Sequence, residues 1–234
     1  MSARRRILRL AWRLVLLALL AFVGLQLWFL AHIVYWRFQN PGPTAFMQHE
    51  LERLRAKDPK AGLRQQWLPY ERISNNLKRA VIAAEDAHFT EHEGVDWEAV
   101  QKAYEENARR GRPVKGGSTI SQQLAKNLFL SPEKSYLRKA EELIITAMLE
   151  LAWDKRRILE VYLNVAEWGD GLFGAEAAAH HYYGVSAGQI DAEQAARLAA
   201  FLPNPKRYGR LRTGPFLDRR TEHILHYMPV AQVP

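Results

Sequence analysis

Glu85 is the side chain whose position most directly suggests proton transfer. Residues 73–88 are predicted to be helical, because Ser74 can cap the start and one face is apolar, formed by Leu77, Ala80, Val81 and Ala84. Glu85 lies beside this face. Partial burial disfavours a charged carboxylate and raises its pKa toward the range of a general base near neutral pH. The alternative is a helix-end glutamate whose carboxylate reaches water, and on this segment alone both interpretations stay open.

A glycine pair, Gly116-Gly117, precedes a second predicted helix that carries a polar face. Thr119 and Gln122 have the spacing of a capping box, and Ile120, Leu124 and Leu128 form an inward stripe. A different face gathers Thr119, Gln123 and Lys126. Free N–H groups at the helix start favour an anion, and Lys126 adds a full positive charge. A solvated polar face after a flexible loop explains the pattern equally well.

A third helix is predicted over residues 138–154, with the ionic pair Arg138 and Glu142 one turn apart. The apolar positions predict a buried stripe formed by Ala140, Leu143, Ile144, Ala147 and Leu151, and the ionic pair lies away from it. Such i,i+4 pairs are common and contribute only about 0.2–0.5 kcal/mol. The three segments together place two carboxylates and three cations on helix edges: Glu85, Glu142, Lys126, Arg138 and Lys139.

The elements that hold these helices begin with a predicted membrane anchor. Residues 14–36 contain no Asp, Glu, Lys or Arg and exceed the roughly 20 residues that span a bilayer. Five arginines precede them without an acidic residue, so we expect residues 1–13 in the cytoplasm and the remainder outside it. A cleaved signal peptide is the alternative, but the apolar stretch exceeds the usual h-region of about 7–15 residues.

Charge and composition narrow the classes of function. The net charge of +8 comes from 33 Lys and Arg against 25 Asp and Glu; five arginines precede the span, so 28 basic residues remain, a net +3. This favours anionic lipid or a phosphorylated substrate over nucleic acid. Cysteine is absent, which excludes disulfides and thiolate metal sites. We expect a linker or membrane-proximal segment over residues 37–67 and one mostly α-helical domain over residues 68–234.

Four sequence blocks in order resemble the peptidoglycan glycosyltransferase family, which also supplies a domain of bifunctional penicillin-binding proteins. The resemblance spans roughly residues 68–220, and a lone anchor without a second domain resembles the monofunctional members. The blocks are Glu85-Asp86-x-x-Phe89-x-x-His92-x-Gly94-x-Asp96, Gly116-Gly117-Ser118-Thr119-Ile120-Ser121-Gln122-Gln123-Leu124-Ala125-Lys126-Asn127, Arg138-Lys139-x-x-Glu142 and Ile158-x-Glu160-x-Tyr162-Leu163-Asn164.

The resemblance implies that lipid II is polymerised into β-1,4-linked glycan at the outer face of the cytoplasmic (inner) membrane, with inversion at the donor anomeric carbon. Glu85 would be the catalytic base, and Lys126, Arg138 and Lys139 would stabilise the departing pyrophosphate. Glu142 would be the second catalytic carboxylate, binding a divalent cation (Mg²⁺ or Mn²⁺) or orienting the cations. Gln123, Thr119, Asn127 and His92 are further candidate substrate contacts. No organic cofactor is expected.

The implied fold is all-α and lysozyme-like, with a smaller membrane-proximal jaw over residues 97–115 that could lie against lipid headgroups. Structural roles are expected for several motif residues: Phe89 in the core, Gly94 in a turn, Asp96 as a helix cap, and Glu160, Tyr162 and Asn164 as scaffold. For His92 a structural hydrogen bond is the alternative, and Asp86 is expected to order the loop after Glu85. The resemblance implies lipid II, the lipid-linked glycan, membrane lipids and divisome or elongation proteins as partners.

Two other classes of function remain as alternatives. A lysozyme-like hydrolase or lytic transglycosylase would use a protonated Glu85 as its general acid. It would have little need of the three cations, whereas a pyrophosphate donor needs them. A catalytically silent, membrane-anchored scaffold of the wall machinery would tolerate substitution of both glutamates.

Overall fold

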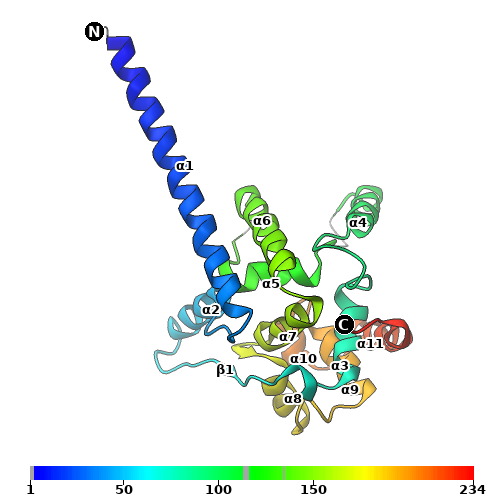
Figure 1. Ribbon diagram of the computed structural model, residues 1–234. Coiled ribbons are helices and arrows are strands. Elements are labelled where there is room, and N and C mark those ends of the chain that lie inside the picture. Colours follow the sequence, from blue (N-terminus) through cyan, green and yellow to red (C-terminus); the bar gives the residue numbers. More distant parts are fainter. Residues whose placement is uncertain (1–2, 113–115, 134) are drawn as a thin grey trace. The chain divides into compact units, whose positions relative to one another are not determined.

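The computed structural model describes residues 3–112, 116–133 and 135–234, without the side chains of residues 3–6. The chain divides into two compact units, residues 1–39 and 40–234. The first unit contains one long helix, α1 (Ala3–Trp36) (Figure 1). Its stretch Ile7–Trp36 is long and apolar enough to cross a membrane, which agrees with the predicted anchor.

The second unit is mostly helical, as the sequence predicts (Figure 1). Its helices are α2 (Ala45–Arg55), η1 (Tyr70–Arg72), α3 (Asn75–Glu85), α4 (Trp97–Arg110), α5 (Ile120–Phe129), α6 (Tyr136–Ala152), α7 (Lys155–Val165), α8 (Ala175–Tyr183), α9 (Ala192–Phe201), α10 (Pro205–Leu211), α11 (Pro215–Tyr227) and η2 (Met228–Val230).

Side-chain caps lie at the starts of α3, α4 and α5, three helices that line the site described below. The hydroxyl of Ser74 accepts the N–H of Asn76 at the start of α3. Asp96 caps α4, and Thr119 and Gln122 form the expected capping box of α5. These bonds satisfy N–H groups that have no partner inside a helix. The predicted starts of all three helices are therefore confirmed.

The core lies around α7, which is buried from Ile158 to Val165 except at Glu160. Helix α5 packs against α6 and α7, and α9 packs against α3 and α11. The inward stripe predicted on α5, Ile120, Leu124 and Leu128, is fully buried. A three-stranded sheet lies beside these helices, in the order β1 (Arg64–Gln65), β3 (Leu172–Phe173) and β2 (Glu167–Gly169), with β1 parallel and β2 antiparallel to β3.

Part of the segment expected as a linker, residues 37–67, is folded. It contains α2 and β1; α2 packs against α5, and β1 pairs with β3. Residues 40–67 belong to the same compact unit as the rest of the domain. The apolar positions of α2 are few, and contacts from distant segments hold it in place, so local sequence patterns did not show it.

The predicted buried stripe of α6 is wrong. The structure buries Glu142, Ile145, Thr146 and Leu149, whereas Leu143 and Leu151 are 37% and 88% exposed. Apolar residues lie on two faces of this helix, so periodicity alone could not tell which face meets the core. Glu142 was expected to lie away from the buried stripe, but it is on the inner face and only 4% exposed.

The expected jaw contains α4, while residues 113–115 of its predicted range lie outside the described residues. In Figure 1, α4 and α6 extend from the same side of the second unit. Both helices expose large apolar side chains, among them Trp97, Tyr104, Tyr136, Leu137 and Leu151.

Candidate active site

A cleft of ≈ 1020 Å³ brings together the residues of the three chemical motifs. Glu85 reaches it from the end of α3, Gln123 and Lys126 from α5, and Arg138, Lys139 and Glu142 from α6. A second hollow, of ≈ 670 Å³, shares Glu85 and Gln123 with the first and extends toward α4 and α11. Glu85 therefore lies where the two hollows meet.

The Glu85 carboxylate is held by one neutral and one charged donor. It ends α3, because the extended backbone of Asp86 breaks the helix there. Gln123 donates its Nε2 to Oε2 at 2.9 Å, and Arg220 donates to Oε1 at 3.0 Å. Burial raises the pKa of Glu85, and these two donors lower it by less, so the net direction is upward. This is the direction that the sequence predicts for a base.

Tyr162 fixes the orientation of Gln123. The buried Tyr162 hydroxyl donates to Oε1 of Gln123 at 3.0 Å, which leaves the amide nitrogen to face Glu85. Tyr162 was expected to be scaffold, and it does lie in the core on α7. Its hydroxyl also extends the hydrogen-bonded chain from the core to the Glu85 carboxylate.

Glu142 gathers the cations of α6. Arg138 donates to Oε2 at 2.7 Å, and Lys139 pairs with Oε1. Lys126 is the third cation, and burial lowers its pKa, with Arg138 and Lys139 acting in the same direction and Glu142 against them. Lys126, Arg138 and Lys139 therefore line the same cleft as Glu85.

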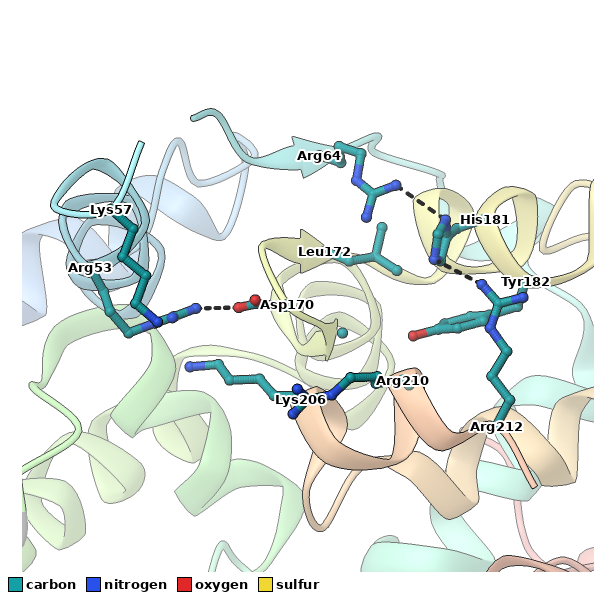
Figure 2. Close-up of a pocket in the computed structure, with 12 residues that line it drawn as sticks. Arg53, Lys57, Arg64, Asp170, Leu172, His181, Tyr182, Lys206, Arg210 and Arg212 are labelled. Carbon is teal, nitrogen blue, oxygen red and sulfur yellow. Dashed lines mark hydrogen bonds and ion pairs between the residues drawn. The ribbon is translucent and has the colours of Figure 1, made fainter. Parts of the chain in front are cut away.

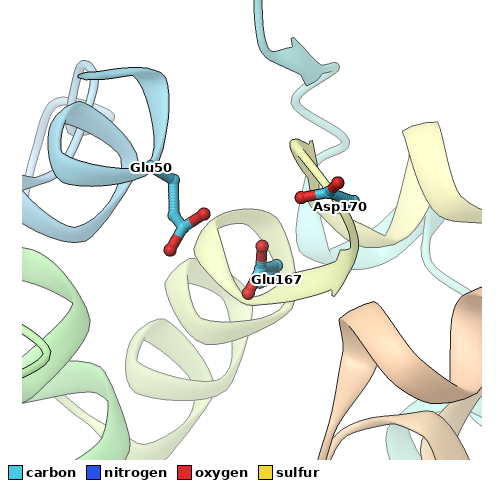
Figure 3. A group of neighbouring side chains, drawn as sticks. All are labelled: Glu50, Glu167 and Asp170. Atoms are coloured by element: carbon cyan, nitrogen blue, oxygen red, sulfur yellow. The ribbon is translucent and has the colours of Figure 1, made fainter. Parts of the chain in front are cut away.

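Glu142 alone does not form a metal site with its protein neighbours. Both of its oxygens already accept from cations. Among the described residues, carboxylates with the spacing of metal ligands are found at Glu50, Glu167 and Asp170, a group that does not include Glu142 (Figure 3).

The remaining candidate contacts lie at the edge of the cleft or behind it. Thr119 lines the second hollow, but its hydroxyl donates to the Gly94 carbonyl at 2.6 Å, beside its role as a cap. Asn127 is 7% exposed and lines neither hollow. His92 also lies outside both linings. Substrate contacts by these three residues stay predictions.

Asp86 connects the end of α3 to the start of α5. One of its carboxylate oxygens pairs with His92 Nε2 at 2.9 Å, and the other accepts the N–H of Ile120 at 3.0 Å. His92 therefore makes the structural bond that was its alternative interpretation. Asp86 orders the loop after Glu85, as expected, and fixes the distance between the helices that carry Glu85 and Lys126.

Other motif residues support the cleft as the sequence predicts. Phe89 is fully buried, and Gly94 adopts φ 88°, where an added Cβ would lie 2.7 Å from Thr146. Asn164 bonds both the N–H and the carbonyl of Leu68, and Glu160 accepts the N–H of Tyr70.

Sequence reasoning missed Arg220 altogether. This residue lies on α11, 135 positions from Glu85, and no short motif surrounds it. Its approach to Glu85 depends on α11 and α3 both packing against α9. The one available signal was that the family resemblance ends near this residue.

A largely buried carboxylate of raised pKa that shares a helical cleft with three cations is the arrangement expected of an enzyme that transfers a group from an anionic leaving group. The chain belongs to the Transglycosylase family, whose model matches residues 51–229, so the predicted family and its lysozyme-like fold are confirmed. It is similar to the biosynthetic peptidoglycan transglycosylase of Janthinobacterium sp. (strain Marseille), with 60% identity over 223 residues, 95% of this chain and 96% of that protein.

Proteins with the same name from Dechloromonas aromatica (strain RCB) and Chromobacterium violaceum are also similar. The first is 61% identical over 222 residues, covering 93% of this chain and 96% of that protein. The second is 51% identical over 226 residues, covering 97% and 99%. The similarity therefore extends through the anchor as well as the domain.

Proposed function

We propose that this protein is a peptidoglycan glycosyltransferase that polymerises lipid II into β-1,4-linked glycan strands. The observation that carries the proposal is the cleft itself, in which Glu85 and three cations line one hollow. Family membership and the names of the relatives support the same function.

Glu85 takes the proton from the attacking 4-hydroxyl of the acceptor sugar. Its raised pKa makes it a stronger base than an exposed glutamate, and Gln123 and Arg220 orient its carboxylate. The hydroxyl oxygen then bonds to the donor anomeric carbon as the bond to pyrophosphate breaks, so the configuration at that carbon inverts.

Lys126, Arg138 and Lys139 stabilise the charge that develops on the departing pyrophosphate. Cations placed at that position stabilise the transition state more than the ground state. Glu142 keeps Arg138 and Lys139 in place through one carboxylate. The lowered pKa of Lys126 reflects its burial, and an arriving pyrophosphate would favour its charged form.

A divalent cation is part of the proposal only as an ion that Glu142 would share with the substrate phosphates. Glu142 offers one carboxylate whose oxygens are already engaged, so substrate phosphate oxygens would have to supply most of the coordination of Mg²⁺ or Mn²⁺. On the protein side, the observed contacts favour the orienting role of Glu142.

The other two classes of function are not favoured. A hydrolase of neutral glycosidic bonds has little need of three cations in the cleft that holds Glu85. A silent scaffold gives no reason for a buried glutamate held by Gln123 and Arg220.

The proposed location is the inner membrane. Helix α1 contains one stretch that suits a single span, and the five arginines at its start support an N-terminus in the cytoplasm with the catalytic unit on the outer side. Membrane lipids and lipid-linked glycan are then the immediate neighbours. Divisome or elongation proteins are the proposed recruiting partners.

The test is polymerisation of labelled lipid II by the full-length protein in detergent with Mg²⁺. Glu85→Gln keeps the shape of the side chain but removes the base, so we expect a loss of about 10²–10⁴-fold. Glu93→Gln, an exposed neighbour on the following loop, is the matched control and should retain activity. Polymer formation by Glu85→Gln at the parent rate would refute the role of Glu85. Cleavage of mature glycan without polymerisation would favour the hydrolase.

A further inference from the structure

A separate hollow of ≈ 520 Å³ lies in the catalytic unit and shares no lining residue with the cleft (Figure 2). We call it the α2–α10 pocket. Segments far apart in the sequence form its walls: α2, β1, the turn between β2 and β3, α8 and α10. Six cationic side chains line it: Arg53, Lys57, Arg64, Lys206, Arg210 and Arg212.

Two of the six cations are already neutralised by carboxylates. Arg53 pairs with Glu50 at 2.6 Å and with Asp170, and Lys206 pairs with Glu50 at 2.5 Å. Glu167 lies in the same group (Figure 3). Burial raises its pKa to about 8, so it holds a proton at neutral pH. Arg53 bridges Glu50 and Asp170, and Lys206 lies 2.5 Å from Glu50 and 3.7 Å from Glu167, so these two cations are paired with the acidic group.

The other four cations have no carboxylate partner within the part of the chain that the structure describes. They are Lys57, Arg64, Arg210 and Arg212, from three different segments around the pocket. Like charges that converge without a counter-ion repel one another. An anion bound in the pocket would relieve this repulsion.

The contacts of His181 show most directly that the arginines of the pocket lack a hydrogen-bond acceptor. Its Nδ1 lies 3.1 Å from a nitrogen of Arg64, and its Nε2 lies 3.4 Å from a nitrogen of Arg212 (Figure 2). A guanidinium can only donate, and a neutral imidazole has one accepting nitrogen. Burial lowers the pKa of His181, and both arginines act in the same direction, so the ring stays neutral. In one of the two contacts, therefore, an N–H of the imidazole faces an N–H of a guanidinium, and neither can accept.

The backbone conformation of Arg212 also supports a bound anion in the pocket. It has φ 60° and ends α10, and among the described residues it is the one non-glycine residue with a positive φ. Glycine occupies this conformation without strain, so an arginine here indicates that the side chain is used. The Arg212 guanidinium also lies over the Tyr182 ring, 5.2 Å from its centroid, which directs it into the pocket.

We propose that the α2–α10 pocket binds a phosphate-bearing ligand with at least two negative charges, held between Arg64 and Arg212. A phosphate offers oxygens to both guanidiniums at once and can accept two parallel hydrogen bonds from either. Lys57 and Arg210 supply the remaining positive charge. A single carboxylate would leave most of that charge unbalanced, so phosphate is favoured over an acidic side chain. A lipid headgroup and a soluble phosphate compound share this chemistry.

Inorganic pyrophosphate is the probe, and the full-length protein in detergent is the target. Because the catalytic cleft also accepts pyrophosphate, the readout must be local to His181. We expect pyrophosphate to raise the pKa of His181, followed by NMR of labelled histidine and assigned with His181→Gln. In calorimetry, one of the binding events should weaken about tenfold or more in Arg64→Gln/Arg212→Gly. Arg79→Ala, which removes an exposed charge on α3, is the matched control.

The choice of variants separates binding from folding. Arg212→Gly removes the cation and relieves the positive φ, so its thermal unfolding temperature should be unchanged or higher. Lipid II polymerisation should persist in the double variant, because neither residue lines the cleft.

Three further outcomes decide the source and the class of ligand. A shift of the His181 signal in nanodiscs with phosphatidic acid, but not in phosphatidylcholine alone, would identify the headgroup as the source. A shift with pyrophosphate in phosphatidylcholine nanodiscs would identify a soluble compound. If neither changes the signal, or if oligoglutamate alone does, the proposal is overturned.

Discussion

At the scale of single residues, the basicity of Glu85 is a balance between burial and two donors. Its side chain is 12% exposed, so desolvation disfavours the carboxylate. Gln123 and Arg220 recover part of that cost by donating to opposite oxygens. Burial alone would raise the pKa of Glu85 further and favour the protonated form, which cannot accept a proton. Full charge pairing alone would make it a weak base.

Removal of Arg220 should shift the pH dependence of activity. Arg220 lowers the pKa of Glu85, so Arg220→Ala should raise it further. A base must be deprotonated to work, hence the acidic limb of the kcat/KM profile should move to higher pH. Activity at neutral pH should fall, and part of it should return as the pH rises. The measurement is the pH profile of lipid II polymerisation.

Arg219→Ala is the control for this experiment, because Arg219 is the exposed neighbour on the same helix. It should leave the acidic limb in place. An unchanged limb in Arg220→Ala, with only a uniform loss of rate, would mean that Arg220 supports the fold of α11 and does not tune Glu85.

The residues of the site differ in how far the sequence could predict them. The sequence showed Glu85, Lys126 and three residues of α6 because their motifs are local and resemble a family. The α6 residues are Arg138, Lys139 and Glu142. Arg220 was not, because its distance from Glu85 depends on the packing of three helices. The same holds for the α2–α10 pocket, whose cations come from segments between Arg53 and Arg212 that no motif connects.

At the scale of elements, caps were predictable and buried faces were not. Ser74, Asp96 and Thr119 each cap the helix expected of them, because capping depends on three or four adjacent residues. The inner face of α6 depends on where α5 and α7 lie. Its apolar residues on two sides gave an ambiguous pattern, and the exposed side was mistaken for the buried one.

Thr119 should be the most sensitive of these caps. Its hydroxyl accepts the N–H of Gln122 and donates to the Gly94 carbonyl, and the residue is buried. Thr119→Val keeps the shape but loses both bonds, so we expect about 1–3 kcal/mol lower stability. Urea unfolding of a chain of residues 40–234 would measure it. Thr119→Ser retains the hydroxyl and should lose much less; equal losses in both variants would assign the effect to the methyl group.

At the scale of the whole molecule, a buried acid that lines neither hollow of the site should govern how stability depends on pH. Burial raises the folded-state pKa of Glu167 to about 8, well above the ordinary glutamate value of 4.5. The stability it contributes is therefore fully present below about pH 4.5 and is lost as pH rises through about 8.

Glu167→Gln should remove this part of the pH dependence. Between about pH 5 and about pH 9, the free energy of unfolding of the parent should fall relative to the variant by a few kcal/mol, at about 1.4 kcal/mol per pKa unit. Urea unfolding at several pH values provides the measurement. Glu222→Gln, an exposed carboxylate on α11, should run parallel to the parent. Parallel curves for Glu167→Gln as well would show that Glu167 is ionised in the folded state.

The exposed apolar side chains of α4 and α6 bear on how a lipid-linked substrate reaches the cleft. They extend from one side of the catalytic unit, where Trp97, Leu137 and Leu151 are 71%, 85% and 88% exposed. Such a surface favours the interface of a bilayer, so the unit should bind vesicles without its anchor.

Replacing Trp97, Leu137 and Leu151 by serine in a chain of residues 40–234 should weaken sedimentation with anionic vesicles at least about tenfold. Val230→Ser, which removes one exposed apolar residue elsewhere, should not. Equal binding by both variants would mean that these three side chains do not hold the unit at the bilayer, and the lipid-linked substrate would then have to reach Glu85 without this apolar surface as its path.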